Sequence, residues 1–219
     1  MKKIIFIILI STTVFILSML IIAEIFLLNE LGFTLISNNS NMQREIIKYE
    51  NIIPNLDESI NNVYFGIAID KFYIVKFTAF SIEYENKYYL ITAKHSIINK
   101  DKIIKNIRFK SNSGSAWIYP ELLYCKDNFS NNDDLAIFYS DKINNGFKID
   151  TENDKPNYVL GNKYLNINII RNFNIKTKKG ESGSPIIDSD GEVMGIIINT
   201  DNRFYTPINS VVQAIDNLN

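Results

Sequence analysis

From residue 63 onward, short apolar runs alternate with polar turn clusters. The runs are rich in Tyr, Phe, Ile and Val and show partial alternation, which is typical of β-strands with one buried face. In the first half they span residues 63–69, 73–85, 87–93, 106–110, 116–124 and 135–140. In the second half they span residues 158–161, 165–170, 173–176, 185–188, 192–199 and 203–208. The pattern predicts an all-β domain.

The chain ends in an amphipathic stretch, residues 209–218, which predicts a C-terminal helix with Asn209 or Ser210 as its N-cap. Upstream of the domain, a polar Asn/Ser patch precedes a short helix-like stretch that ends near Pro54. This mixture is more typical of a spacer than of a core. The predicted organisation is an N-terminal anchor over residues 1–28, a spacer over 29–62 and the β-rich domain over 63–219.

The run Ile4–Ala23 is apolar and has about the length of a membrane-spanning helix. It is longer than the apolar part of a cleaved signal peptide, and Ile21 breaks the small-residue pattern of a cleavage site after Ala23. Lys2 and Lys3 precede it, so the positive-inside tendency keeps the N-terminus in the cytoplasm and sends the domain outside. A single-pass anchor is therefore predicted, with full secretion through a cleaved signal peptide as the alternative.

Composition and charge narrow the possible functions. The sequence is 46% hydrophobic and 21% charged, which supplies a core and argues against disorder. A formal net charge of −1 and the lack of a basic stripe argue against a nucleic-acid partner. With one cysteine and one histidine, the chain can form neither an intrachain disulfide nor a cysteine cage or His-rich zinc site. No metal or cofactor is expected.

Ser182 lies in the segment GESGSP, between Gly180 and Gly183. Glycine permits sharp backbone bends. Such a turn can point the N–H groups of Gly180 and Ser182 at one spot beside the hydroxyl, which is how an oxyanion hole is formed. The alternative is an ordinary Gly/Ser loop, because short motifs recur by chance. The segment makes Ser182 a candidate nucleophile.

A serine nucleophile needs a base to accept its proton, and His95 is the sole histidine. It follows the run YYLITA, so the pattern predicts an imidazole at a strand end, facing a cleft. A carboxylate should orient that imidazole, and Asp133 and Asp134 stand at the entry to an apolar strand. The alternatives are a histidine without a role and a solvated acidic turn.

Three segments together, LITAKHS, DDLAIF and GESGSPIIDSDGEVMGI, resemble the His, Asp and Ser motifs of the chymotrypsin-like (trypsin-like) serine peptidases. The last is most similar to the bacterial HtrA-type and glutamyl-endopeptidase-like members. The resemblance covers residues 63–218 and implies two six-stranded-type β-barrels, without the PDZ domains of HtrA enzymes. Only 47 residues separate Asp134 from Ser182, so the second barrel is expected to be trimmed.

The resemblance implies a role for each motif position. His95 becomes the general base, Asp134 its orienting carboxylate and Ser182 the nucleophile, and the N–H groups of Gly180 and Ser182 form the oxyanion hole. The strand after the DSDG turn would pair with an extended substrate backbone by β-augmentation. The residues that would line the substrate site are Lys176, Thr177, Lys179, Ile197, Ile198 and Asn199.

Two functional hypotheses remain open. The first is a serine endopeptidase that cleaves protein or peptide substrates through an acyl-enzyme; Lys176 and Lys179 would then favour an acidic side chain, although a solvated basic loop is the plainer interpretation. The second is a catalytically silent barrel that binds extended peptides or a partner protein. The order His, Asp, Ser argues against an α/β-hydrolase, in which the serine comes first.

Overall fold

The computed structural model describes residues 16–19, 40, 42–71, 73–100, 102–125, 134–152, 155–165, 167–199 and 205–218. The chain divides into two compact units, Met1–Asn41 and Met42–Asn219, and the fold described below is that of the second unit. Of the predicted anchor Ile4–Ala23, only residues 16–19 are described, and they are helical. No helix within the described ranges is long and apolar enough to cross a membrane. The anchor therefore remains a prediction.

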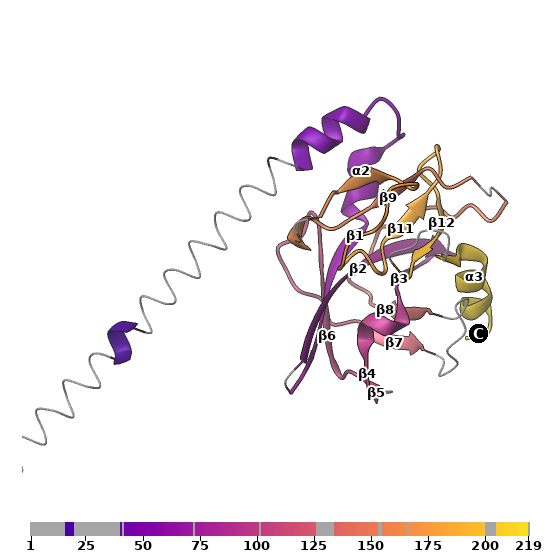
Figure 1. Cartoon of the computed structure of the whole chain (residues 1–219). Coiled ribbons are helices and arrows are strands. Elements are labelled where there is room, and N and C mark those ends of the chain that lie inside the picture. The colour runs from indigo at the N-terminus through magenta and orange to yellow at the C-terminus, as the bar shows by residue number, and fades with distance from the viewer. Residues whose placement is uncertain are drawn as a thin grey trace, which may run out of the picture. The chain divides into compact units, whose positions relative to one another are not determined.

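The first sheet has six antiparallel strands in the order β6-β1-β2-β3-β8-β7 (Figure 1). Their bounds are β1 Val63–Asp70, β2 Tyr73–Tyr84, β3 Lys87–Thr92, β6 Asn106–Ser111, β7 Glu121–Tyr124 and β8 Ala136–Tyr139. The β2–β3 hairpin is closed by Glu85 and Asn86, both with positive φ, as the tight two-residue turn between twisted strands requires. A small separate hairpin joins β4 Ile98–Asn99 to β5 Lys102–Ile103.

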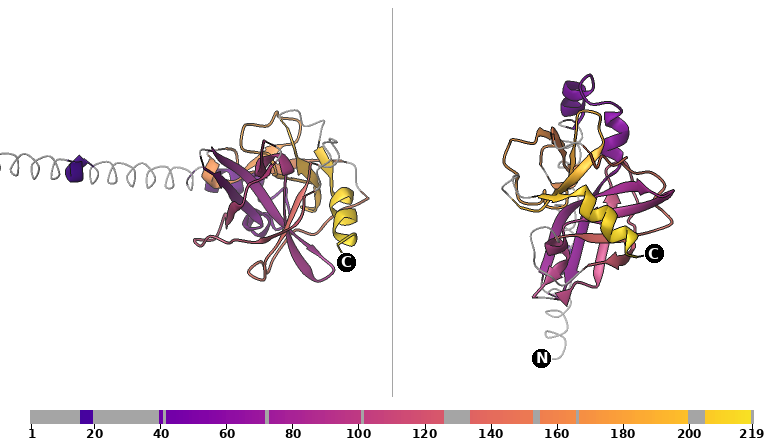
Figure 2. Two further views of the ribbon diagram at one scale, coloured as in Figure 1. Left: turned by 90° about the horizontal axis from the view of Figure 1, so that it is seen from below. Right: turned by 90° about the vertical axis from the view of Figure 1, so that its right-hand side faces the viewer.

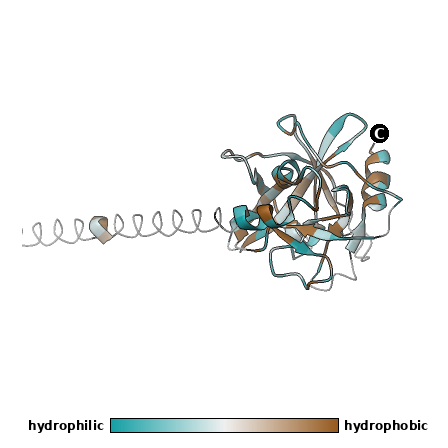
Figure 3. Ribbon diagram, turned by 90° about the horizontal axis from the view of Figure 1, so that it is seen from above, coloured by the Kyte–Doolittle hydropathy of each residue, from teal (hydrophilic) through white to brown (hydrophobic). Residues whose placement is uncertain are grey.

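The second sheet has five strands in the order β10-β9-β11-β12-β13, and the C-terminal helix α3 contacts β12. The bounds are β9 Tyr158–Leu160, β10 Ile170–Asn172, β11 Pro185–Ile187, β12 Val193–Ile197, β13 Tyr205–Pro207 and α3 Ile208–Asp216. Figure 2 shows α3 on the surface of this unit, and Figure 3 shows its hydrophilic and hydrophobic residues. Its N-cap is Pro207, not the predicted Asn209 or Ser210, because β13 runs directly into the helix.

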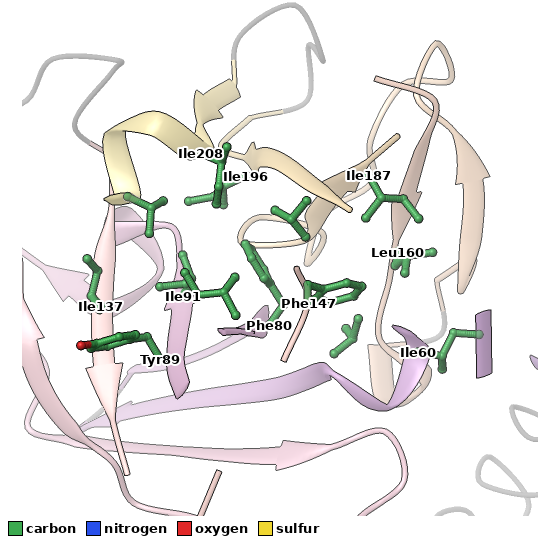
Figure 4. Close-up of a cluster of buried hydrophobic side chains, with 14 of the residues drawn as sticks. Ile60, Phe80, Tyr89, Ile91, Ile137, Phe147, Leu160, Ile187, Ile196 and Ile208 are labelled. Atoms are coloured by element: carbon green, nitrogen blue, oxygen red, sulfur yellow. The ribbon is translucent and has the colours of Figure 1, made fainter. Parts of the chain in front are cut away.

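The main apolar cluster lies between the two sheets (Figure 4). Phe80, Ile91 and Ile137 come from the first sheet, and Leu160, Ile187 and Ile196 come from the second. A further cluster within the first sheet contains Phe77, Phe109 and Phe138, whose rings meet edge to face. The structure confirms a mostly β architecture of two half-barrel sheets with a C-terminal helix, and the second sheet has fewer described strands than the first.

Residues 42–62 differ from the predicted spacer, because they pack onto the domain. Residues 42–49 form a helix and are followed, after a turn, by the helix α2 Leu56–Asn61. Four apolar side chains of this segment are buried in the main cluster: Ile46, Ile53, Leu56 and Ile60. Tyr49 also meets Tyr158 of β9 edge to face at 5.6 Å. Burial of these side chains removes apolar surface from water, so the compact unit begins at Met42 rather than Val63.

The segment between β9 and β11 also differs from the prediction of strands over residues 165–170 and 173–176. A 3₁₀ turn η3, Lys163–Leu165, comes first, and the strand β10 spans only Ile170–Asn172. The Arg171 guanidinium donates to the carbonyls of Asn172 and Ile175. These two bonds fold residues 172–175 back as a turn.

Candidate active site

His95 and Asp134 are in direct contact at the end of the first sheet. His95 lies in the 3₁₀ turn η1, Lys94–Ile97, which follows β3, and Asp134 precedes β8. Because β3 and β8 pair as Thr92 with Ala136, the two side chains meet. The Asp134 Oδ2 atom lies 2.6 Å from His95 Nδ1, and Asp134 Oδ1 accepts the His95 backbone N–H at 2.8 Å. This double contact fixes the orientation of the ring, which is 45% exposed. Asp133, the other candidate, lies outside the described residues.

The turn that carries Ser182 depends on its two glycines in different ways. Gly180 has φ +99° and Gly183 has φ +85°, a region that L-residues with side chains rarely adopt. A Cβ atom at Gly183 would also lie 2.0 Å from the Thr78 carbonyl oxygen and 2.2 Å from Thr92 Oγ1. Gly183 therefore lets the turn approach β2 and β3 of the first sheet.

Thr78 joins this turn to the first sheet. Its backbone N–H donates to the Ser182 carbonyl at 3.1 Å, and its hydroxyl donates to the Gly180 carbonyl at 3.0 Å. Thr92, three residues before His95, donates from its hydroxyl to the Thr78 carbonyl at 2.7 Å. The network brings Ser182 to the strand end that carries the imidazole, although no hydrogen bond joins the Ser182 hydroxyl to His95 among the described residues. Sequence reasoning missed both threonines, since each reads only as a strand residue.

The backbone N–H groups of the turn divide into bonded and free ones. Those of Glu181, Gly183 and Ser184 donate to carbonyls of Lys178, Ile197 and Glu181, respectively. Across the described part of the chain, no acceptor is bonded to the N–H groups of Gly180 and Ser182. Two free donors in one tight turn are what an oxyanion hole requires.

The charge of Glu181, the residue before Ser182, is neutralised within the protein. Glu181 is buried, and its Oε2 atom lies 3.1 Å from Arg171 Nε and accepts the Lys178 N–H at 2.8 Å. The side chains of Arg171 and Glu181 are 3% and 1% exposed. Burial lowers the pKa of the Arg171 guanidinium from its ordinary value, and Glu181 opposes that shift. Charges buried this deeply are costly unless they are paired.

The predicted substrate residues differ in their surroundings. Both backbone groups of Ile197 bond to the turn of Ser182, because the Ile197 N–H donates to the Ser184 carbonyl and the Ile197 carbonyl accepts the Gly183 N–H. Ile197 is therefore not available for β-augmentation, which corrects the prediction. The Thr177 hydroxyl donates to the Asn199 carbonyl at 2.8 Å, so this hydrogen bond holds the segment before Ser182 to the segment after β12. Lys176 and Lys179 are exposed.

The backbone of Ile198 differs from that of Ile197. Hydrogen bonds between described residues leave the Ile198 backbone unengaged, so Ile198 is the better candidate for contact with a substrate backbone. In the described ranges, no group of three His, Cys, Asp or Glu side chains could hold a metal ion.

Solved structures share this architecture. The serine endoprotease from Yersinia pestis matches with a TM-score of 0.58 at 17% identity, over 74% of this chain and 64% of that one. The active form of the Rv3671c protease from M. tuberculosis matches with a TM-score of 0.56 at 13% identity, over 75% of this chain and 84% of that one. The fold is that of the trypsin-like, HtrA-type serine peptidases.

A further trypsin-like match is the HtrA-type protease AlgW with a tripeptide, at a TM-score of 0.56 and 14% identity, over 78% of this chain and 63% of that one. No protein-family model matches the sequence, and no curated protein matches it. At identities of 13% to 17% the likeness shows the fold alone. A fold by itself does not determine the chemistry of a site.

Proposed function

We propose that the protein is a serine endopeptidase with Ser182 as its nucleophile. The observation that supports this most directly is the oriented His95–Asp134 pair, together with two free N–H groups on the turn of Ser182. A barrel that only binds peptides has no physical need of an activated base beside a serine with an adjacent anion site. A silent peptide-binding barrel is the alternative.

In the proposed reaction, the Ser182 oxygen attacks the scissile carbonyl carbon while its proton passes to His95 Nε2. Asp134 stabilises the imidazolium that forms, and the N–H groups of Gly180 and Ser182 bind the oxyanion. The C–N bond then breaks as His95 gives the proton to the leaving amine, which leaves an acyl-enzyme. Water, deprotonated by His95, attacks the ester carbon. The C–O bond to Ser182 then breaks as His95 returns the proton to the Ser182 oxygen, which releases the acid.

The proposed substrate is an extended protein or peptide segment. Its backbone would lie along Ile198 and Asn199, and the exposed ammonium groups of Lys176 and Lys179 would attract an acidic side chain before the cut. For location, we propose that the N-terminal segment anchors the chain in a membrane with the peptidase domain outside the cytoplasm, as its two lysines and apolar run indicate.

A fluorophosphonate probe, which reacts covalently with activated serines, tests the proposal on the full chain. The wild type should be labelled, and Ser182→Ala and His95→Ala should not be. Ser184→Ala is the matched control, because this serine lies in the same turn but is fully buried. If the folded wild type resists labelling, the peptidase proposal fails and the peptide-binding alternative takes its place.

A further inference from the structure

The segment between β10 and the nucleophile is closed by the buried ion pair. Arg171 lies in β10, and Glu181 is the residue directly before Ser182. The Arg171 side chain bonds to Glu181 at the far end of residues 171–181. It also bonds to the carbonyls of Asn172 and Ile175 near the start of that segment. The geometry of Glu181 also sets where the two free N–H groups of the turn point, because they flank it.

The N-terminal helix of residues 42–49 contacts the start of β10. The Glu45 Oε2 atom accepts the backbone N–H of Ile169 at 2.5 Å and that of Ile170 at 3.1 Å. These hydrogen bonds to a carboxylate are the stronger kind, and they end one residue before Arg171. The helix is itself held by Ile46, which is buried in the main cluster, and by the Tyr49–Tyr158 contact.

We propose that Glu45 and Arg171 are positioning residues for Ser182, acting through Glu181. This inference rests on the proposed peptidase function. Glu45 holds the start of β10, Arg171 extends from β10 to Glu181, and Glu181 holds the turn with its two N–H donors. The helix that follows the predicted membrane anchor thereby becomes part of the support of the active site. Displacement of a reacting group by about 1 Å can slow a reaction about 100-fold.

The first experiment follows the rate of fluorophosphonate labelling of the full chain as a function of pH. Arg171→Met removes the charge, and we expect the maximal labelling rate to fall at least about tenfold. The probe concentration that gives half of the maximal rate should change little. Arg171→Lys keeps a cation opposite Glu181. A buried lysine loses its proton more easily than arginine. The labelling rate of Arg171→Lys relative to the wild type should therefore fall further as the pH rises from about 7 to 10.

Arg108→Lys serves as the control, because Arg108 stacks on Trp117 in the first sheet, away from β10. Its rate relative to wild type should not change with pH. If Arg171→Met instead labels like the wild type at every pH, the positioning role of Arg171 is refuted. The wild type would still be labelled, so the peptidase proposal would survive that result.

The second experiment tests the link to the helix. Glu45→Ala leaves two backbone N–H groups without their acceptor, and labelling should slow about threefold or more, because hydrogen bonds to a charged acceptor are the stronger kind. Glu45→Gln retains an oxygen acceptor and should recover most of the rate. Amide hydrogen exchange at Ile169 and Ile170 should be faster in Glu45→Ala only. Equal labelling of Glu45→Ala and the exposed control Glu50→Ala would refute the role of the helix.

Discussion

Gly183→Ala is expected to damage both stability and the site. An added Cβ atom would lie 2.0 Å from the Thr78 carbonyl oxygen and 2.2 Å from Thr92 Oγ1, and neither neighbour is the far end of a flexible side chain. Such overpacking costs about 1–3 kcal/mol. The left-handed backbone at φ +85° adds about 1–2 kcal/mol for a residue with a side chain. The free energy of unfolding should therefore fall by about 2–5 kcal/mol.

Urea unfolding of the full chain measures this loss through the fluorescence of Trp117, the single tryptophan. A slope of about 2 kcal/mol per molar converts it into a midpoint about 1–2.5 M lower. Gly114→Ala is the control, because its Cβ atom would make ordinary contact, 3.4 Å from Ser111 Cβ. Fluorophosphonate labelling should fall as well, because the clash pushes the turn away from β2. Equal midpoints for the two variants would refute the close approach of the turn.

Three further predictions concern labelling and substrate preference. Asp134→Asn should fold but label on the order of 10³–10⁴-fold more slowly, because the amide fails to hold the imidazole of His95 in the reactive form. Thr78→Val removes the hydroxyl donor to the Gly180 carbonyl, and a loss of about 1 kcal/mol corresponds to labelling about fivefold slower. Lys179→Ala should lower any preference for Glu or Asp in a peptide library by about two- to fivefold, since exposed charge pairs contribute little.

Each of these predictions has its own control. Asp141→Asn alters an exposed aspartate and should leave labelling unchanged, so equal rates for the two Asn variants would contradict the role of Asp134. Thr78→Ser keeps the hydroxyl and should recover labelling. If the peptide library shows no enrichment of acidic residues before the cut, the proposal for Lys179 is refuted. The control is Lys142→Ala, which removes another exposed lysine and should leave the preference unchanged.

The strand pattern and the turn glycines were accessible from local sequence. Pro185 begins β11, and Asp188 closes the following turn by accepting the N–H groups of Asp190 and Glu192. Such features depend on residues a few positions apart, which is the range over which periodicity and turn preferences act. The predicted strand boundaries were wrong where a side chain bonds to the backbone. Arg171 does so at Asn172 and Ile175, and residues 172–175 form a turn in place of a strand.

The N-terminal helices illustrate the opposite case. An isolated short helix is marginal in water, so residues 42–62 have the local pattern of a spacer, and only burial of Ile46 and Leu56 makes them part of the domain. Burial depends on the surface that the rest of the fold provides, which the local pattern does not contain.

The sequence by itself determined the all-β class, the C-terminal helix and the candidate nucleophile and base, because each rests on a local pattern or on the only residue of its type. The local pattern left Asp133 and Asp134 open as the carboxylate, and the family resemblance selected Asp134. Tertiary structure alone decided the supports of that site. Thr78 reaches Gly180 across 102 positions, and Glu45 reaches Ile169 across 124. Contacts at such separations arise when two sheets and a helix bury a shared core, and they leave no periodic trace along the chain.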